Sequence, residues 1–180
     1  MKHSKPMLLL SGTPASGKDT ITSLLLELNS RFRHFQKHRA SDQPKDDGTY
    51  IHATPDEFRV MAEQGEFLQH HYRYDRGYGV SLKVLNQHWA NGEIPIIHVG
   101  KYENIAPLRA PETNTISVLI MVSLSETERR LKQRHINDAE EINRRITAYH
   151  EERAELADLI NSGAHLEFDL IIENSKNNPE

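Results

Sequence analysis

Residues 12–20 read GTPASGKDT, a glycine-rich stretch of the kind that binds the phosphates of a nucleotide. Gly12, Gly17 and Lys18 fit the pattern G-x-x-x-x-G-K-[ST], but Asp19 stands where the pattern has Ser or Thr. Such a loop holds anions through backbone N–H groups at a helix N-terminus, and its lysine bridges the β and γ phosphates. Carboxylates suit Mg²⁺, so Asp19 and the following Thr20 are the candidate metal ligands.

The elements around this stretch are those that a phosphate loop needs. The apolar run from Met7 to Leu10 predicts a buried strand, and the residues after the loop predict a helix to about Asn29. ATP and Mg²⁺ are therefore the expected cofactors. The predicted nucleotide-binding residues are Gly12, Thr13, Pro14, Ala15, Ser16, Gly17, Lys18, Asp19 and Thr20, and the helix face expected to pack on the core holds Ile21, Leu24, Leu25 and Leu28.

Short apolar runs alternate with amphipathic stretches along the rest of the chain, which predicts an α/β fold with a largely parallel sheet. The runs IPIIHVG, TISVLIMVSL and FDLIIEN are the further expected strands. A capping box of Thr54 and Glu57 predicts a helix to about Gln64. A second box of Ser125 and Glu128 predicts another helix. A long helix is expected over about 139–161, with Gly163 as its stop.

Composition limits the classes of function. The 180 residues, 37% of them hydrophobic, are enough for one domain with a sizeable core. A net charge of −4 with mixed signs favours neither nucleic acid nor an anionic membrane as a partner. The absence of cysteine excludes disulfides and thiolate chemistry and fits a cytoplasmic location. No apolar segment is long enough to span a bilayer, and a homo-oligomer is left open.

Beyond the loop, the sequence resembles the guanylate kinases over nearly its whole length. This resemblance implies a three-layer P-loop NTPase fold in one domain, 1–180, with a core of about 6–35 and 82–175, an acceptor-binding insert of about 36–81 and an arginine lid of about 134–145. Tyr50 and Tyr78 match tyrosines that hold the acceptor phosphate, and Arg134 and Arg145 match the phosphate-contacting arginines of the lid. Asn174 in IIEN matches the last strand of the family, after which the usual C-terminal helix is not evident.

The departures from that family concern the acceptor. Gln69 and Gly100 occupy the positions of the two carboxylates that read guanine, and His98 replaces another strand aspartate. A Gln amide accepts at one atom and sets its NH₂ against a guanine donor, so GMP is not expected to be the best acceptor. The stretch SDQPK offers Lys45 in place of an arginine pair, and a lysine is a point charge without the bidentate fork of arginine.

These features predict an ATP-dependent phosphotransferase. Lys18, Arg134 and Arg145 are the expected catalytic residues, and the acceptor is a phosphorylated small molecule, with a nucleoside monophosphate as the first choice. One alternative is a sugar-phosphate kinase, because the ribose 1,5-bisphosphate phosphokinases share G-K-D-[ST] and lack the guanine-reading carboxylates. The other is a non-catalytic guanylate kinase-like binding module. The predicted acceptor-binding residues are Lys45, Tyr50, Gln69, Tyr78, His98 and Gly100.

Overall fold

The computed structural model describes residues 5–42, 48–73, 76–134, 138–162 and 168–175. Its main sheet has the strand order β2-β7-β1-β8-β9, and all four neighbouring pairs are parallel. The five strands are β1 (Pro6–Ser11), β2 (Phe32–His34), β7 (Ile94–Val99), β8 (Asn114–Met121) and β9 (Leu170–Glu173). The predicted α/β fold with a mostly parallel sheet is confirmed.

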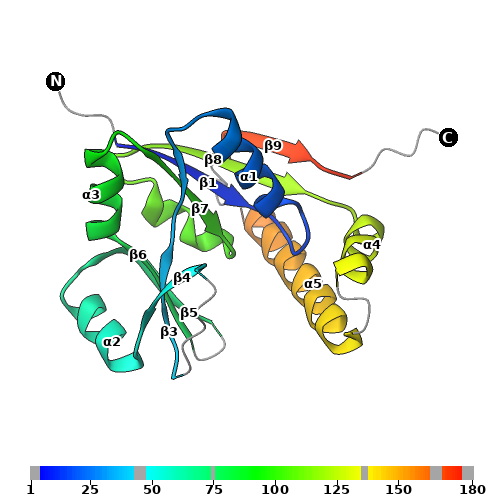
Figure 1. Ribbon diagram of the computed structural model, residues 1–180. Helices are drawn as coiled ribbons and strands as arrows, with labels where there is room; N and C mark the ends of the chain where they lie inside the picture. The colour runs from blue at the N-terminus through cyan, green and yellow to red at the C-terminus, as the bar shows by residue number, and fades with distance from the viewer. Residues whose placement is uncertain (1–4, 43–47, 74–75, 135–137, 163–167, 176–180) are drawn as a thin grey trace.

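Helices cover both faces of this sheet (Figure 1). Alternate residues of β1 point to opposite sides, so Leu10 packs toward α1 (Lys18–Leu28) while Leu9 packs toward α3 (Leu82–Ala90) and α5 (Ala139–Asn161). Both faces of the central strands β1 and β7 are buried in this way, which explains why these strands read as continuous apolar runs. Two short 3₁₀ turns, η1 (Tyr102–Asn104) and η2 (Ala106–Leu108), lead from β7 towards β8.

A second sheet is built from residues 37–81 and lies beside the main one (Figure 1). Its strand order is β4-β3-β6-β5, and α2 (Pro55–Glu63) packs on one face through the buried Phe58. The capping box predicted for α2 is present, because Thr54 and Glu57 each accept from the other's backbone N–H. The four strands are β3 (Lys37–Ala40), β4 (Tyr50–Ala53), β5 (Phe67–Arg73) and β6 (Arg76–Ser81).

Two details differ from the sequence predictions. On α1, Ile21 packs on the sheet, but Leu24 and Leu28 are 58% and 80% exposed, because no described element covers that side of the helix. The helix α4 (Leu124–Arg134) begins earlier than the Ser125–Glu128 box predicts. The Ser123 hydroxyl accepts from the backbone N–H of Glu126 at 3.3 Å, so Ser123 caps the helix.

The long helix α5 has the predicted bounds, and the carboxylate of Asp138 accepts from the backbone N–H of Glu141 at its start. Gly163, the predicted stop of α5, lies outside the described residues, as does the chain after residue 175. Among the described helices, none combines the length and the apolar character that crossing a membrane requires.

Candidate active site

The loop between β1 and α1 folds as a phosphate-binding loop. Gly12 has φ 148°, and a Cβ there would lie 2.3 Å from the carbonyl oxygen of Ile120 in the neighbouring strand. Gly17 has φ 104° and immediately precedes α1, where no side chain caps the helix. The free N–H groups of the first turn therefore point out of the helix end as an anion site. Both positions have the positive φ values that glycine adopts readily, which explains why the motif has glycine there.

Lys18 lies inside this loop. Its ammonium group donates to the carbonyl oxygens of Gly12 and Thr13, the latter at 3.1 Å, and approaches the Ser16 hydroxyl at 3.4 Å. Burial lowers the pKa of Lys18, while the carboxylates of Glu152 and Asp19 oppose that shift. The ammonium group of Lys18 is therefore held inside the loop. When a phosphate binds there, its oxygens would replace the loop carbonyl oxygens as partners of this group.

Residues distant in sequence support the loop from behind. Asn174, just after β9, donates its amide N–H to the carbonyl oxygen of Ser16 at 2.8 Å. Arg130 of α4 donates to the carbonyl oxygens of Ala15 and Asn174, at 2.9 and 2.6 Å. The sequence predictions assigned no role to Arg130, because this residue belongs to none of the motifs that were recognised. These contacts connect the loop to both the last strand and the helix that precedes the predicted lid.

Arginines of α4 and α5 face the loop across a cavity of about 430 Å³. The predicted Arg134 and Arg145 both line it, together with Arg144, which sequence analysis did not single out. Arg145 donates to Glu141 at 2.7 Å, and Arg144 also pairs with Glu141, whose pKa is lowered chiefly by the bond to Arg145. All three arginines are exposed at the cavity edge.

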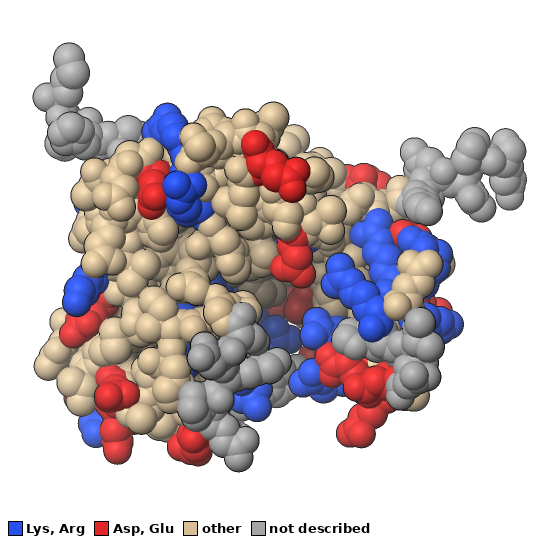
Figure 2. Space-filling view, viewed as in Figure 1, with Lys and Arg blue, Asp and Glu red and all other residues tan. Residues whose placement is uncertain are grey.

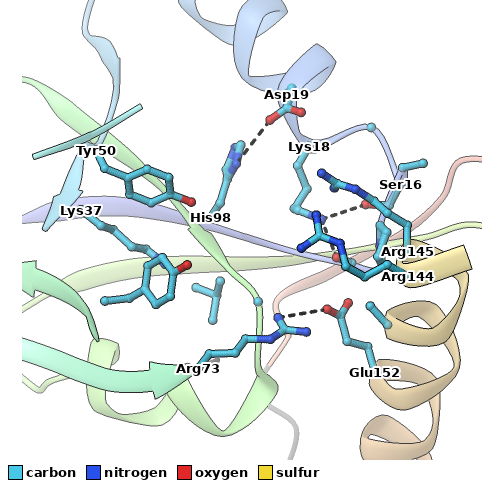
Figure 3. A pocket seen from close by; sticks show the side chains of 18 of the residues that line it. Ser16, Lys18, Asp19, Lys37, Tyr50, Arg73, His98, Arg144, Arg145 and Glu152 are labelled. Carbon is cyan, nitrogen blue, oxygen red and sulfur yellow. Dashed lines mark hydrogen bonds and ion pairs between the residues drawn. The ribbon is translucent and has the colours of Figure 1, made fainter. Parts of the chain in front are cut away.

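The opposite wall comes from the second sheet. Tyr50 and Tyr78 line the cavity edge-to-face with ring centroids 5.7 Å apart, and His71 stacks on Tyr78 at 5.5 Å and 20°. Lys37 and Tyr50 are paired in the register of β3 and β4, and both enter the cavity from that side (Figure 3). The second sheet therefore contributes rings to the cavity wall, although Tyr72 of β5 is 60% exposed.

Basic side chains dominate the cavity. In Figure 2 Lys and Arg side chains gather at the hollow between the second sheet and the α4–α5 pair. The described residues that line the cavity include seven cations, Lys18, Lys37, Arg73, Arg76, Arg134, Arg144 and Arg145, and two carboxylates, Asp19 and Glu152. This excess of positive charge is local, because the whole chain carries −4. A cavity of this kind suits two ligands that both carry phosphate groups.

Four of these seven cations were missed, Lys37 and Arg73 among them, because composition does not show where a charge points. Lys37 is half-buried at the cavity, and burial lowers its pKa to about 8; it has no ion pair among the described residues. Arg73 lies 3.5 Å from Glu152 of α5, so this pair joins the second sheet to the lid side (Figure 3). Burial raises the pKa of Glu152 to about 7, despite the nearby charges of Lys18 and Arg73. Only the alternation along β5 places Arg73 on the cavity face.

The structure separates the predicted acceptor residues into three groups. Tyr50, Tyr78, His98 and Gly100 line the cavity. Gln69 does not line it, because its side chain is buried and donates to Asn104 at 2.8 Å. Lys45 lies outside the described residues.

Of the predicted metal ligands, Asp19 reaches the cavity and Thr20 does not. Asp19 is at the rim, with its carboxylate 3.6 Å from Nδ1 of His98, and Thr20 is exposed. The other nitrogen of His98 lies 2.8 Å from the Thr22 hydroxyl, and burial lowers the pKa of His98 to about 4. Among the described residues no group of three metal-ligating side chains occurs. One rim carboxylate nevertheless fits Mg²⁺, which takes most of its ligands from substrate phosphates and water.

One side of the cavity thus has a glycine loop and a lysine that can bind the phosphates of one ligand. The opposite side has cationic and aromatic side chains that can contact a second ligand. This arrangement defines a P-loop phosphotransferase, in which positioning and charge neutralisation catalyse the transfer.

Comparison with known proteins gives the family. Residues 4–178 match the family model described as Guanylate kinase, so the chain belongs to the guanylate kinase family. The guanylate kinase of Hydrogenovibrio crunogenus is 26% identical over 174 residues, covering 93% of this chain and 78% of that protein. That of Syntrophus aciditrophicus is 30% identical over 152 residues, covering 82% and 72%. The crystal structure of guanylate kinase from Anaplasma phagocytophilum shares the fold, with a TM-score of 0.61 at 17% identity over 94% of this chain and 76% of that one.

Membership of this family makes the chain an ATP-dependent kinase of the nucleoside monophosphate kinase type, working with ATP and Mg²⁺. The alternative of a non-catalytic binding module is not supported. The chain also keeps the lysine and the arginines that such a module does not need.

Proposed function

We propose that this protein transfers the γ-phosphoryl group of ATP to a phosphorylated small molecule, with a nucleoside monophosphate other than GMP as the preferred acceptor. The observation that carries the proposal is the single cavity in which Lys18 and the lid arginines face the rings and cations of the second sheet. ATP lies with its phosphates on the loop of β1 and α1, and the acceptor lies against Tyr50 and Tyr78.

The side chains supply charge rather than covalent chemistry. An acceptor phosphate oxygen attacks the γ-phosphorus, the bond to the β-phosphate oxygen breaks, and ADP leaves. The acceptor oxygen is already an oxyanion, so no general base is required. Lys18, Arg134 and Arg145 neutralise the charge that develops on the transferred group. Mg²⁺, when bound beside Asp19, would neutralise the phosphate oxygens of ATP.

The acceptor side of the cavity argues against GMP. Guanine presents adjacent N–H donors, and a good partner for them is a carboxylate. Gln69 does not line the cavity and Gly100 has no side chain, while a Cβ at Gly100 would lie 3.4 Å from the guanidinium of Arg73. Losing hydrogen bonds to a charged group costs about 1.5–3 kcal/mol each. The absence of both carboxylates therefore favours an acceptor other than GMP.

One observation supports a second candidate, a sugar-phosphate kinase. Lys37 is half-buried at the cavity without an ion pair among the described residues, and Arg73 and Arg76 line the same cavity. A second phosphate on the acceptor would give Lys37 the counter-ion it lacks, because an ammonium group in a desolvated site needs an opposite charge. Ribose 1,5-bisphosphate carries such a second phosphate.

An ADP-release assay tests both candidates. Wild-type protein with Mg·ATP is supplied separately with AMP, CMP, UMP, GMP, ribose 5-phosphate and ribose 1,5-bisphosphate. The proposal expects the highest kcat/KM with a nucleotide other than GMP, and it fails if GMP is the best substrate. In the sugar-phosphate case Lys37→Met raises the KM for ribose 1,5-bisphosphate far more than that for ribose 5-phosphate, whereas the exposed Lys83→Met changes neither. Release of ADP without any acceptor dependence would contradict both candidates.

A further inference from the structure

His71 has a side chain whose two nitrogens face different surroundings. Its Nδ1 lies 3.1 Å from the amide nitrogen of Gln69, and the ring lines the cavity. Among the described residues no hydrogen bond reaches Nε2. Gln69, His71 and Arg73 alternate along β5 and share its inner face, while His70 and Tyr72 are exposed on the other. One edge of the imidazole is therefore held by the protein, and the other is available to a ligand.

The partners of Gln69 fix which nitrogen of His71 carries the proton. The Gln69 amide nitrogen donates at 2.8 Å to Asn104 Oδ1 in η1, and its second hydrogen faces Nδ1 of His71. An Nδ1 that accepts this bond has a lone pair, so in the neutral ring the proton is on Nε2. Gln69 is 6% exposed and Asn104 7%, so water does not compete with this bond.

The charges around His71 keep the ring neutral. Burial, followed by the charges of Lys37, Lys101 and Arg73, lowers its pKa to about 4, and the carboxylate of Glu103 opposes this. At pH 7 the imidazole is thus a neutral N–H donor, stacked on Tyr78. The two cationic neighbours that line the cavity, Lys37 and Arg73, are hydrogen-bond donors as well.

We propose that His71 determines specificity for the acceptor by donating its Nε2–H to a lone pair of the bound molecule, and that Gln69 and Asn104 are positioning residues that fix this tautomer. The inference rests on the proposed function, because it assumes that the acceptor occupies the side of the cavity lined by the second sheet. It identifies the acceptor chemically: the group that meets His71 is an oxygen or a ring nitrogen without hydrogen. The N–H edge of guanine would set donor against donor.

Nuclear magnetic resonance of protein with ¹⁵N-labelled histidine tests the tautomer directly. Between pH 6 and 8 His71 should be neutral, with its proton on Nε2, and Gln69→Leu should convert it to a mixture of tautomers. A His71 signal with the proton on Nδ1, or one that titrates near pH 6.5, would overturn the proposal. His71→Phe assigns the signal and keeps a ring on Tyr78, so it serves where His71→Ala does not fold.

Acceptor selectivity gives the second measurement. His71→Phe and His71→Ala should lower kcat/KM for the preferred acceptor about tenfold and reduce its ratio to GMP by the same factor, which is about the effect of one hydrogen bond. His70→Ala is the matched control, because His70 lies next in sequence but on the exposed face. Equal losses with every acceptor, or the same loss in His70→Ala, would show that His71 only supports the fold.

The two proposals can fail separately. If none of the six compounds stimulates ADP release, the proposed function is wrong, and thermal stabilisation by the same compounds then decides the role of His71. A compound that stabilises wild type but not His71→Phe supports His71 as a specificity residue. Equal stabilisation of the two proteins, or none of either, contradicts it.

Discussion

Replacing Lys18 by alanine should abolish most of the phosphotransferase activity while the fold survives. The ammonium group lies in a desolvated loop, where a unit charge about 4 Å from an opposite charge contributes about 4 kcal/mol at an effective dielectric constant of about 20. Because one group that stabilises transition-state charge is usually worth about 2.7–4 kcal/mol, kcat should fall by about 10²–10³-fold. The unfolding free energy should change much less, since Gly12, whose carbonyl oxygen Lys18 contacts, borders the cavity and gains water as its partner.

The assay compares wild type, Lys18→Ala and the exposed control Lys83→Ala by ADP release at saturating Mg·ATP and acceptor. Thermal unfolding without ligand should place Lys18→Ala within about 2–4 °C of wild type, equivalent to about 1 kcal/mol for a chain of this size. Turnover of Lys18→Ala within about threefold of wild type would refute the assignment of the loop as the ATP site. A large fall in thermal stability would instead show that the lysine serves the fold.

Three further outcomes are expected. Arg134→Ala and Arg145→Ala should each lower kcat more than they raise the KM for ATP, because the arginines act on charge that develops during transfer, and an effect on KM alone would make them surface residues. Asn174→Ala should lower the unfolding free energy by about 1–3 kcal/mol and weaken ATP binding, because the Ser16 carbonyl loses its partner; unchanged calorimetric affinity for ATP would contradict this. The pKa of Glu152 is raised from 4.5 to about 7 in the folded protein, so the folded state binds the proton more tightly and loses stability as pH rises from about 5 to 7. Glu152→Gln should therefore be more stable than wild type at pH 8 by about 1–3 kcal/mol but not at pH 5, whereas the exposed Glu151→Gln should show no such dependence in denaturant titrations.

Local patterns determined much of the fold and the ATP side of the site. The glycines and lysine of the phosphate loop stand within nine residues, so their geometry follows from the strand, loop and helix that contain them. The long helix α5 was predicted with its observed bounds, because an amphipathic repeat and the glycine after it are local signals. The prediction that Leu24 and Leu28 of α1 pack on the core was wrong. Periodicity gives the direction of an apolar face, but it does not show whether another element covers that face.

The acceptor-binding side of the cavity could not be predicted from local sequence patterns. Lys37, His71 and Arg73 carry no motif, and they meet only because β3 and β5 place their inner faces toward the loop of a different sheet. Gln69 illustrates the difference: its sequence position suggested a base-reading group, whereas in the structure its amide is bonded to Asn104, 35 residues away, and to His71 behind the cavity wall. The sequence by itself determined the ATP site, because short-range spacing is enough to form a phosphate loop. Only the tertiary structure decided the acceptor wall, because hydrogen bonds and charges between distant segments set the direction and protonation of each side chain.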